Sequence, residues 1–282
     1  MFIKIYIMTL KKILKRLFRD NFKILILEVL FKIFRINPLL YAYNRIGILK
    51  YQNEHVTGEK FMIAQVLKSY FEDNEQLVFF DVGANVGNYS KLLARHFSRA
   101  RIYSFEPMPV SYSIASENLK QYPNVVLLNF GFSSNINNLQ KIHTYAGDNS
   151  SSHASLYKEV FTEIHHAKKI EEVSIKLDTI DYFCTNNNIE KINFLKIDTE
   201  GHEMEVLKGA INMITSGRID IIQFEFNEMH VIARVFFKDF YELLSQQYFL
   251  YRLNTDSLIP LKGYDTFYEV FKFQNIVAIK KT

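Results

Sequence analysis

Short, almost purely apolar segments alternate with longer amphipathic segments through most of this chain, and this alternation limits its possible folds. The apolar segments predict strands at residues 77–82, 101–106, 125–130, 192–198 and 219–226. The amphipathic segments predict helices at residues 61–72, 88–97, 110–121, 203–214 and 235–247. Strands that are apolar along their whole length are typical of a parallel sheet covered by helices on both faces. We therefore predict a doubly wound α/β domain, which residues 248–254 and 274–281 close as a hairpin.

The stretch 131–191 interrupts this alternation. Its first part is polar and rich in Ser and Asn, and it predicts a long loop over the edge of the sheet, with at most a short strand or two. EEVSIKLDTI, residues 171–180, predicts a further strand that leads into a helix. Long loops in compact domains are often functional, so this region is a candidate for substrate contacts.

The single cysteine, Cys184, restricts redox and metal chemistry. One cysteine cannot form an internal disulfide, and no group of Cys and His has the spacing of a zinc site. The surrounding TIDYFCTNN predicts a short helix, in which we interpret Cys184 as a buried side chain and not as a nucleophile. A reducing, cytoplasmic location is the default for such a chain.

Residues 1–36 form a basic arm. They contain nine Lys and Arg against two acidic residues, whereas the whole chain has a net charge of +4, so the remainder is mildly acidic. The apolar residues recur at helical spacing, and we expect the helix to end at Pro38. The repeating apolar residues are Leu10, Ile13, Leu14, Leu17 and Phe18. Two interpretations stay open: an interfacial helix on the inner face of an anionic membrane, and a helix packed on the protein's own surface.

Other roles of the arm are disfavoured. No run reaches about 18 uncharged apolar residues, so we expect no transmembrane span. No small-residue cleavage site follows a short apolar core, as a secretory signal would require. The rest of the chain adds no basic patch or aromatic RNA motif, so we expect no nucleic-acid partner.

We predict a helical extension over residues 1–60 and the α/β domain over residues 61–282.

FFDVGANVGNYS, residues 79–90, ends the first predicted strand in a glycine turn. In doubly wound folds ligands bind beyond the carboxyl ends of the strands, and glycine lets the backbone turn sharply and approach a ligand. The spacing from Gly83 to Gly87 is GxxxG, which differs from the GxGxxG of dinucleotide sites. The turn therefore predicts a ligand site that lacks a tight phosphate cradle.

An acidic residue follows at the end of the next strand. Glu106, in YSFEP, stands where a carboxylate usually accepts the hydroxyl groups of a ribose. An adenosine with a non-phosphate tail fits both features, and S-adenosylmethionine is such a ligand: its zwitterionic end would meet Asp81 and backbone amides, and its ribose Glu106. The structural alternative is that Asp81 caps a helix and Glu106 is a surface residue.

At this point the chain resembles the FkbM-type, S-adenosylmethionine-dependent methyltransferases. The matching segments are FDVGANVGNYS (80–90), FEPMP (105–109), VSIKLDTIDYF (173–183) and FLKIDTEGHEMEVLKGA (194–210), and the resemblance covers roughly residues 75–280. It implies a class I methyltransferase (Rossmann-like) fold with a mostly parallel seven-stranded sheet whose last strand is antiparallel. It implies methyl transfer, usually to oxygen and often on a sugar or other secondary metabolite. By position, it places Asp81, Gly83, Asn85 and Gly87 at the methionine end of the cofactor and Glu106 at its ribose.

The chain departs from the family pattern in two places. NFGFSS, residues 129–134, stands where the family shows a small residue followed by an acidic one. The carboxylate expected near the adenine is therefore missing. The basic arm is not part of the shared domain.

KIDTEGHE, residues 196–203, supplies the candidate catalytic groups. Methyl transfer to oxygen needs proximity and a base that takes the hydroxyl proton. Asp198 has the best inferred position, His202 has the best unperturbed pKa, and Glu203 is a third candidate. Each has a structural alternative, because Asp198 and Glu203 also suit a helix N-terminus. A magnesium site of Asp198, Glu225 and Asn227 is conceivable, but no dense carboxylate cluster is visible, so we predict no metal.

The favoured hypothesis is an S-adenosylmethionine-dependent O-methyltransferase that acts on a sugar hydroxyl of a saccharide, glycolipid or secondary-metabolite precursor. Two alternatives remain. One is a non-catalytic, membrane-associated module that keeps the fold and a nucleoside site. The other is a nucleotide-dependent oxidoreductase, against which the GxxxG spacing counts.

Overall fold

The computed structural model describes residues 22–48, 53–72, 76–145, 154–164, 166–167 and 169–281, and the structural statements below concern these residues. The chain divides into two compact units, residues 1–45 and 46–282, and each is described by itself. The boundary thus falls before the one predicted from the sequence, so that residues 46–60 belong to the same unit as the sheet.

The first unit contains two described helices. One covers residues 22–33, and α2, Pro38–Arg45, follows it. Pro38 therefore begins the second helix and does not end the first, which suits a residue that lacks an N–H and has a fixed φ. The predicted amphipathic segment around residues 10–19 lies outside the described residues. None of the helices described here has the length and apolar character needed to cross a bilayer.

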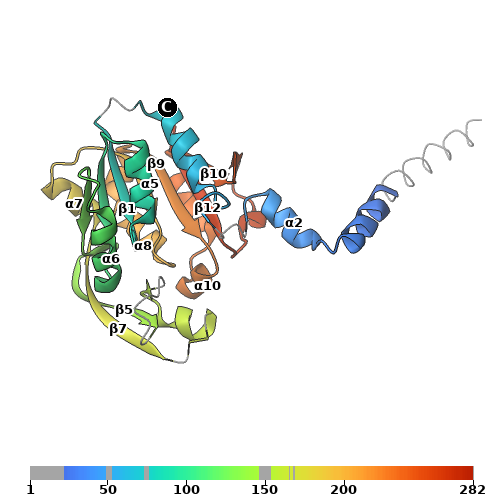
Figure 1. Ribbon diagram of the computed structural model, residues 1–282, viewed down its shortest axis with the longest axis horizontal. Helices are drawn as coiled ribbons and strands as arrows, with labels where there is room; N and C mark the ends of the chain where they lie inside the picture. The colour runs from blue at the N-terminus through green and yellow to red at the C-terminus, as the bar shows by residue number, and fades with distance from the viewer. Residues whose placement is uncertain are drawn as a thin grey trace, which may run out of the picture. The chain divides into compact units, whose positions relative to one another are not determined.

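The second unit is built around an eight-stranded sheet (Figure 1). Its strands are β1 (Val78–Val82), β2 (Arg101–Phe105), β3 (Val125–Leu128), β8 (Ile192–Ile197), β9 (Ile219–Phe226), β10 (Tyr248–Leu253), β11 (Leu258–Pro260) and β12 (Gln274–Lys280). Their spatial order is β11-β10-β12-β9-β8-β1-β2-β3. The five strands from β9 to β3 are parallel, and β12 is antiparallel to β9 and β10. The α/β class and the antiparallel last strand are confirmed, and the short β11 adds one strand to the seven implied by the resemblance.

Helices lie on both faces of this sheet. The described helices of this unit are α3 (Glu59–Phe61), η1 (Met62–Leu67), α4 (Lys68–Tyr70), α5 (Asn88–His96), α6 (Pro109–Leu119), η2 (Val160–Ile164), α7 (Ile180–Asn186), α8 (Glu203–Lys208), α9 (Ile211–Thr215), α10 (Met229–Ala233), α11 (Phe237–Leu244) and η3 (Thr266–Tyr268), of which η2 packs with α10 and β5. α3, η1 and α4 follow one another without a break, and η1 has π-helical geometry. The predicted helix over residues 203–214 is two helices, α8 and α9.

Adjacent side chains on one strand point to opposite faces of the sheet and pack into two different hydrophobic cores. Phe79 and Phe194 pack with η1 and α5, whereas Phe80 and Leu195 pack with the helices α7, α8, α9 and α11. All four side chains are fully buried. Each contributes roughly 1.5–3 kcal/mol through burial, so the two cores fix the register of the central strands.

A second sheet replaces the long loop predicted within residues 131–191. It contains β4 (Gly131–Phe132), β5 (Asn137–Tyr145), β6 (Ala154–Ser155) and β7 (Ile170–Asp178), in the order β4-β7-β5-β6. In Figure 1, β5 and β7 lie below the large sheet. The sequence of β5 is polar because this sheet buries only a small core, made by Ile142, Ile175 and Leu177 with Met108. The predicted strand over residues 171–180 is confirmed as β7, followed by α7.

Candidate active site

The glycine turn after β1 is held between the ends of β2 and β8. The amide groups of Gly83 and Ala84 donate to the carbonyl oxygen of Phe105, both at 3.0 Å. Gly83 has φ +84°, and a Cβ built on it would lie 1.7 Å from the carbonyl oxygen of Asp198. No L-residue with a side chain fits this position without a shift of the backbone. The turn therefore depends on glycine for both its conformation and its close approach to β8.

Glu106 is buried at the end of β2 and faces the turn. One carboxylate oxygen, Oε2, accepts from the amide of Asn85 at 2.7 Å, and the other, Oε1, accepts from the amide of Met108 at 2.8 Å. Burial raises the pKa of Glu106 to about 7, although the two backbone hydrogen bonds oppose this shift. The alternative of a surface residue is therefore wrong, since the side chain is 5% exposed.

Asp81 lies beneath the turn and lines neither of the two pockets described below. It is fully buried, and its Oδ2 accepts from Ser90 Oγ at 2.5 Å. No described residue supplies a hydrogen-bond partner for its other oxygen, Oδ1. Burial raises the pKa of Asp81, and the nearby ammonium of Lys196 opposes that shift. Asp81 thus anchors α5 and places a carboxylate under the turn.

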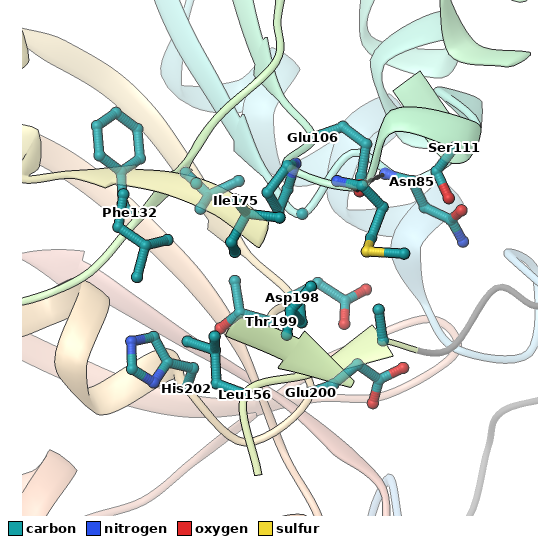
Figure 2. A pocket seen from close by; sticks show the side chains of 18 residues that line it. Asn85, Glu106, Ser111, Phe132, Leu156, Ile175, Asp198, Thr199, Glu200 and His202 are labelled. Atoms are coloured by element: carbon teal, nitrogen blue, oxygen red, sulfur yellow. Dashed lines mark hydrogen bonds between the residues drawn. The ribbon is translucent and has the colours of Figure 1, made fainter. Parts of the chain in front are cut away.

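Two pockets meet at this edge of the sheet. The apolar pocket has an empty volume of about 720 Å³, and the polar pocket one of about 1150 Å³. Gly83, Asn85 and Asp198 line both pockets. The wall of the apolar pocket includes the large apolar side chains of Met108, Phe132, Ile142, Leu156, Ile175 and Leu177. Figure 2 shows Glu106 and Asn85 on one side of it and Asp198, Thr199 and Glu200 across from them. A long ligand with one apolar and one polar end would span both pockets.

Asp198 stands at the junction of the two pockets. It follows β8, and its amide donates to the carbonyl oxygen of Val82 at 2.9 Å. Its Oδ2 accepts from Lys196 Nζ, also at 2.9 Å, while 34% of the side chain remains exposed. Because Lys196 is buried, this ion pair fixes one carboxylate oxygen and leaves the other side of the group open to the pockets.

His202 lines the apolar pocket. Its Nε2 shares a hydrogen bond of 2.9 Å with Ser133 Oγ, and its Nδ1 lies 3.5 Å from Tyr157 Oη. Burial lowers the pKa of His202, although the carboxylates of Glu203 and Glu205 oppose this effect. Burial therefore favours the neutral form of the imidazole. Ser133 belongs to the altered NFGFSS segment, whereas nothing in the sequence singled out Tyr157.

Glu203 points away from both pockets and stabilises the turn after β8. It is fully buried, and it accepts from the amides of Thr199 at 2.7 Å and Gly201 at 3.0 Å. His230 Nε2 lies 3.0 Å from its Oε2. Burial alone would raise the pKa of Glu203, but the hydrogen bond and charge of His230 and the backbone donors hold it below its usual value. A carboxylate with these partners positions the loop that carries Asp198 and His202.

The two remaining candidate groups also have structural partners. Asn227 Nδ2 donates to Glu225, and burial with the carboxylates of Asp198 and Glu200 raises the pKa of Glu225. Within the described ranges, no three His, Cys, Asp or Glu side chains form a group that could hold a metal ion.

Cys184 is buried in α7, and burial raises the pKa of its thiol to about 12, which leaves it protonated at neutral pH.

Comparison with known proteins identifies the family. The model of the methyltransferase FkbM domain matches residues 81–253, which is more than half of the chain. The chain belongs to the FkbM methyltransferase family. The hexuronic acid methyltransferase AglP of Haloferax volcanii is 30% identical over 67% of this chain and 69% of its own length. The 2-O-methyltransferase NoeI of Sinorhizobium fredii is 21% identical over 54% of this chain and 65% of its own length. A solved precorrin-6y C5,15-methyltransferase from Geobacter metallireducens aligns with 82% of this chain and 91% of its own chain, at 14% identity and a TM-score of 0.41.

The cofactor of this FkbM-family protein is S-adenosylmethionine. The residues of the site fit it in two respects. First, Gly83 has no side chain, so the turn can lie close to β8 and expose its backbone where the two pockets meet; a Cβ at this position would prevent that approach. The buried carboxylate of Glu106 lines the apolar pocket and can accept hydrogen bonds from a ribose.

Proposed function

We propose that this FkbM-family protein methylates a hydroxyl oxygen of a sugar in a saccharide, glycolipid or secondary-metabolite precursor. The observation that carries the proposal is the position of Asp198, a partly exposed carboxylate that lines both pockets where they meet. The name of one relative, a hexuronic acid methyltransferase, supports a sugar acceptor, and the name of another, a 2-O-methyltransferase, supports transfer to oxygen.

The geometry supports a division of the cofactor between the two pockets. Gly83, Asn85 and the αL residue Gly87 shape the turn that would hold the methionine end. Glu106 would hold the ribose. The adenine would lie in the apolar pocket between side chains such as Met108, which replace the carboxylate missing from NFGFSS with apolar contacts. Asp81, buried beneath the turn, would not contact the cofactor directly but would hold the turn in place.

S-adenosylmethionine supplies an electrophilic methyl group on its sulfonium sulfur. The protein has to hold the acceptor hydroxyl in line with that group and take its proton. We assign the base to Asp198, which the buried ammonium of Lys196 orients at 2.9 Å. His202 is the second candidate, but it lines only the apolar pocket and both of its ring nitrogens lie near hydroxyl groups. Glu203 has a positioning role.

The test is methyl transfer to defined saccharides. The purified protein is incubated with methyl-labelled S-adenosylmethionine and a panel of hexuronic acids, neutral sugars and glycolipids. We expect label in a saccharide as an ether that survives mild alkali. Label that mild alkali releases would instead indicate a carboxylate ester. Binding of a nicotinamide dinucleotide without methyl transfer would favour the oxidoreductase alternative and overturn the proposal.

The proposed role of Glu106 predicts a pH dependence of cofactor affinity. The pKa of the free protein's Glu106 is raised to about 7, and ribose hydroxyls donate to the ionised form. Affinity should therefore rise with pH, by about tenfold between pH 6 and pH 8, and then level off. Calorimetric titration with S-adenosylhomocysteine measures this profile. Glu106→Gln should bind more weakly and without the inflection, whereas an unchanged inflection in this variant would assign the titration to another group.

The basic arm supports attachment to an anionic membrane surface. Its described helix, residues 22–33, is apolar around most of its circumference, with Lys23, Glu28 and Lys32 as its charged residues. Such a helix needs an apolar environment. Deletion of residues 1–36 should abolish co-sedimentation with anionic liposomes at low salt. Equal co-sedimentation of the shortened and full chains would refute this part of the proposal.

A further inference from the structure

Residues 53–61, which we call the strap, precede the family-matched region and pack against the end of β10. Gly58 has φ +84°, and a Cβ built on it would lie 2.3 Å from the carbonyl oxygen of Asn254. Thr255 Oγ1 donates to the carbonyl oxygen of Val56 at 3.3 Å. These contacts fix the strap against a hairpin that is distant in sequence, and α3 begins at the next residue, Glu59.

The strap brings Glu59 to the polar pocket, where Asn85, Lys196 and Asp198 also contribute to the wall. Glu59 Oε2 accepts from Thr57 Oγ1 at 3.2 Å, which orients the carboxylate. Because Asn85 and Asp198 are shared with the apolar pocket, the strap closes the same continuous site that holds the cofactor.

The charges around Lys196 are unbalanced. Burial alone would lower the pKa of Lys196, but the carboxylates of Asp198, Asp81 and Glu59 outweigh it and raise that pKa. The Tyr89 ring covers the ammonium at 4.8 Å from its centroid. Three acidic side chains thus act on one buried ammonium, and burial raises the pKa of two of them, Asp81 and Glu59. Asp198 takes the direct ion pair, and Asp81 Oδ1 has no hydrogen-bond partner among the described residues. A cationic ligand group would correct this imbalance.

We infer that Glu59 binds the α-ammonium group at the methionine end of S-adenosylmethionine. The cofactor carries two positive charges, on its sulfonium and its α-ammonium group, beside one carboxylate. Asp198 lies at the pocket junction, and Glu59 lines only the polar pocket, so the more distant α-ammonium is the group within its reach. The strap is thereby a part of the cofactor site that lies outside the segment matched by the family model.

The test compares three ligands by calorimetry on the full chain and on Glu59→Gln. S-adenosylmethionine and S-adenosylhomocysteine both carry the α-ammonium group, whereas 5′-methylthioadenosine lacks the whole amino-acid end. We expect the Kd of the first two to rise by about tenfold to a hundredfold, as for a lost hydrogen bond between charged groups. The Kd of 5′-methylthioadenosine should stay within about twofold of the wild-type value.

Controls separate recognition from folding. Glu242→Gln, on the exposed face of α11, removes the same charge away from the pocket and should change no Kd. If Glu59→Gln fails to fold, Glu59→Asp keeps the charge but withdraws it by one methylene, and should weaken the same two ligands only. Equal weakening of all three ligands, weakening of S-adenosylmethionine alone, or no weakening overturns the inference. Since no acceptor is used, none of these outcomes bears on the proposed sugar methylation.

Discussion

Asp198→Asn is expected to lower kcat for methyl transfer by about 10²- to 10⁴-fold, the usual contribution of a general base. The asparagine keeps the size of the side chain and can still lie beside Lys196, but it cannot take the proton of the acceptor hydroxyl. Affinity for S-adenosylhomocysteine should remain within about tenfold of the wild-type value, since only one of the three carboxylates near Lys196 is lost. Initial rates with labelled cofactor and calorimetry measure the two quantities.

His202→Gln is the matched comparison for this experiment. Glutamine can still hydrogen-bond to Ser133, so this variant should lose less than about tenfold in kcat if Asp198 is the base. A loss in His202→Gln that equals or exceeds the loss in Asp198→Asn would transfer the role of base to the imidazole. Urea denaturation checks that both variants remain folded, because Asp198→Asn removes the direct ion-pair partner of the buried Lys196.

Gly83→Ala is expected to lower the free energy of unfolding by about 3 kcal/mol or more and to abolish cofactor binding. The new methyl group would lie 1.7 Å from the carbonyl oxygen of Asp198, and φ is +84°. Since that oxygen belongs to the backbone, β1 and β8 would have to separate where the two pockets meet. Urea denaturation gives the stability change, and calorimetry gives the change in binding.

Gly263→Ala is the control for Gly83→Ala. Gly263 also has a positive φ, +74°, but a Cβ there would meet no atom within 4 Å. It should cost only the backbone strain, about 1–2 kcal/mol, and leave binding intact. If the two variants lost equal stability, the close approach of the turn to β8 would not be the source of the effect.

Seven of the eight strands of the large sheet could be predicted, because each is largely apolar, whereas the three-residue β11 was not predicted. β9 was predicted at residues 219–226, where the structure has it. The second sheet could not be predicted in the same way. In β5 the apolar Ile142 lies between polar neighbours, and its partner β7 together with Met108 supplies the rest of a small core. A strand buried on one side with few apolar residues has the same local pattern as a polar loop.

Some residues of the candidate site could be predicted from local sequence, whereas others depend on contacts with distant parts of the chain. The turn at Gly83 and the carboxylate of Glu106 follow from local sequence, because each stands at the end of a predictable strand. The position of Glu203 does not, since the burial of its carboxylate depends on His230 from α10. Glu59 received no role from the sequence, because its place at the pocket depends on contacts of the strap with residues near 254.

The place of β12 has a consequence for the order in which the protein can fold during synthesis. β12 follows every other described strand in the chain, yet it lies between β9 and β10 in the sheet. Until the ribosome has released residues 274–280, β9 has an unpaired edge, and β10 can pair only with the three-residue β11. Unpaired edges of nascent chains promote association with other chains. A ribosome stalled before β12 should therefore carry a chain with two exposed sheet edges, which chaperones would have to shield.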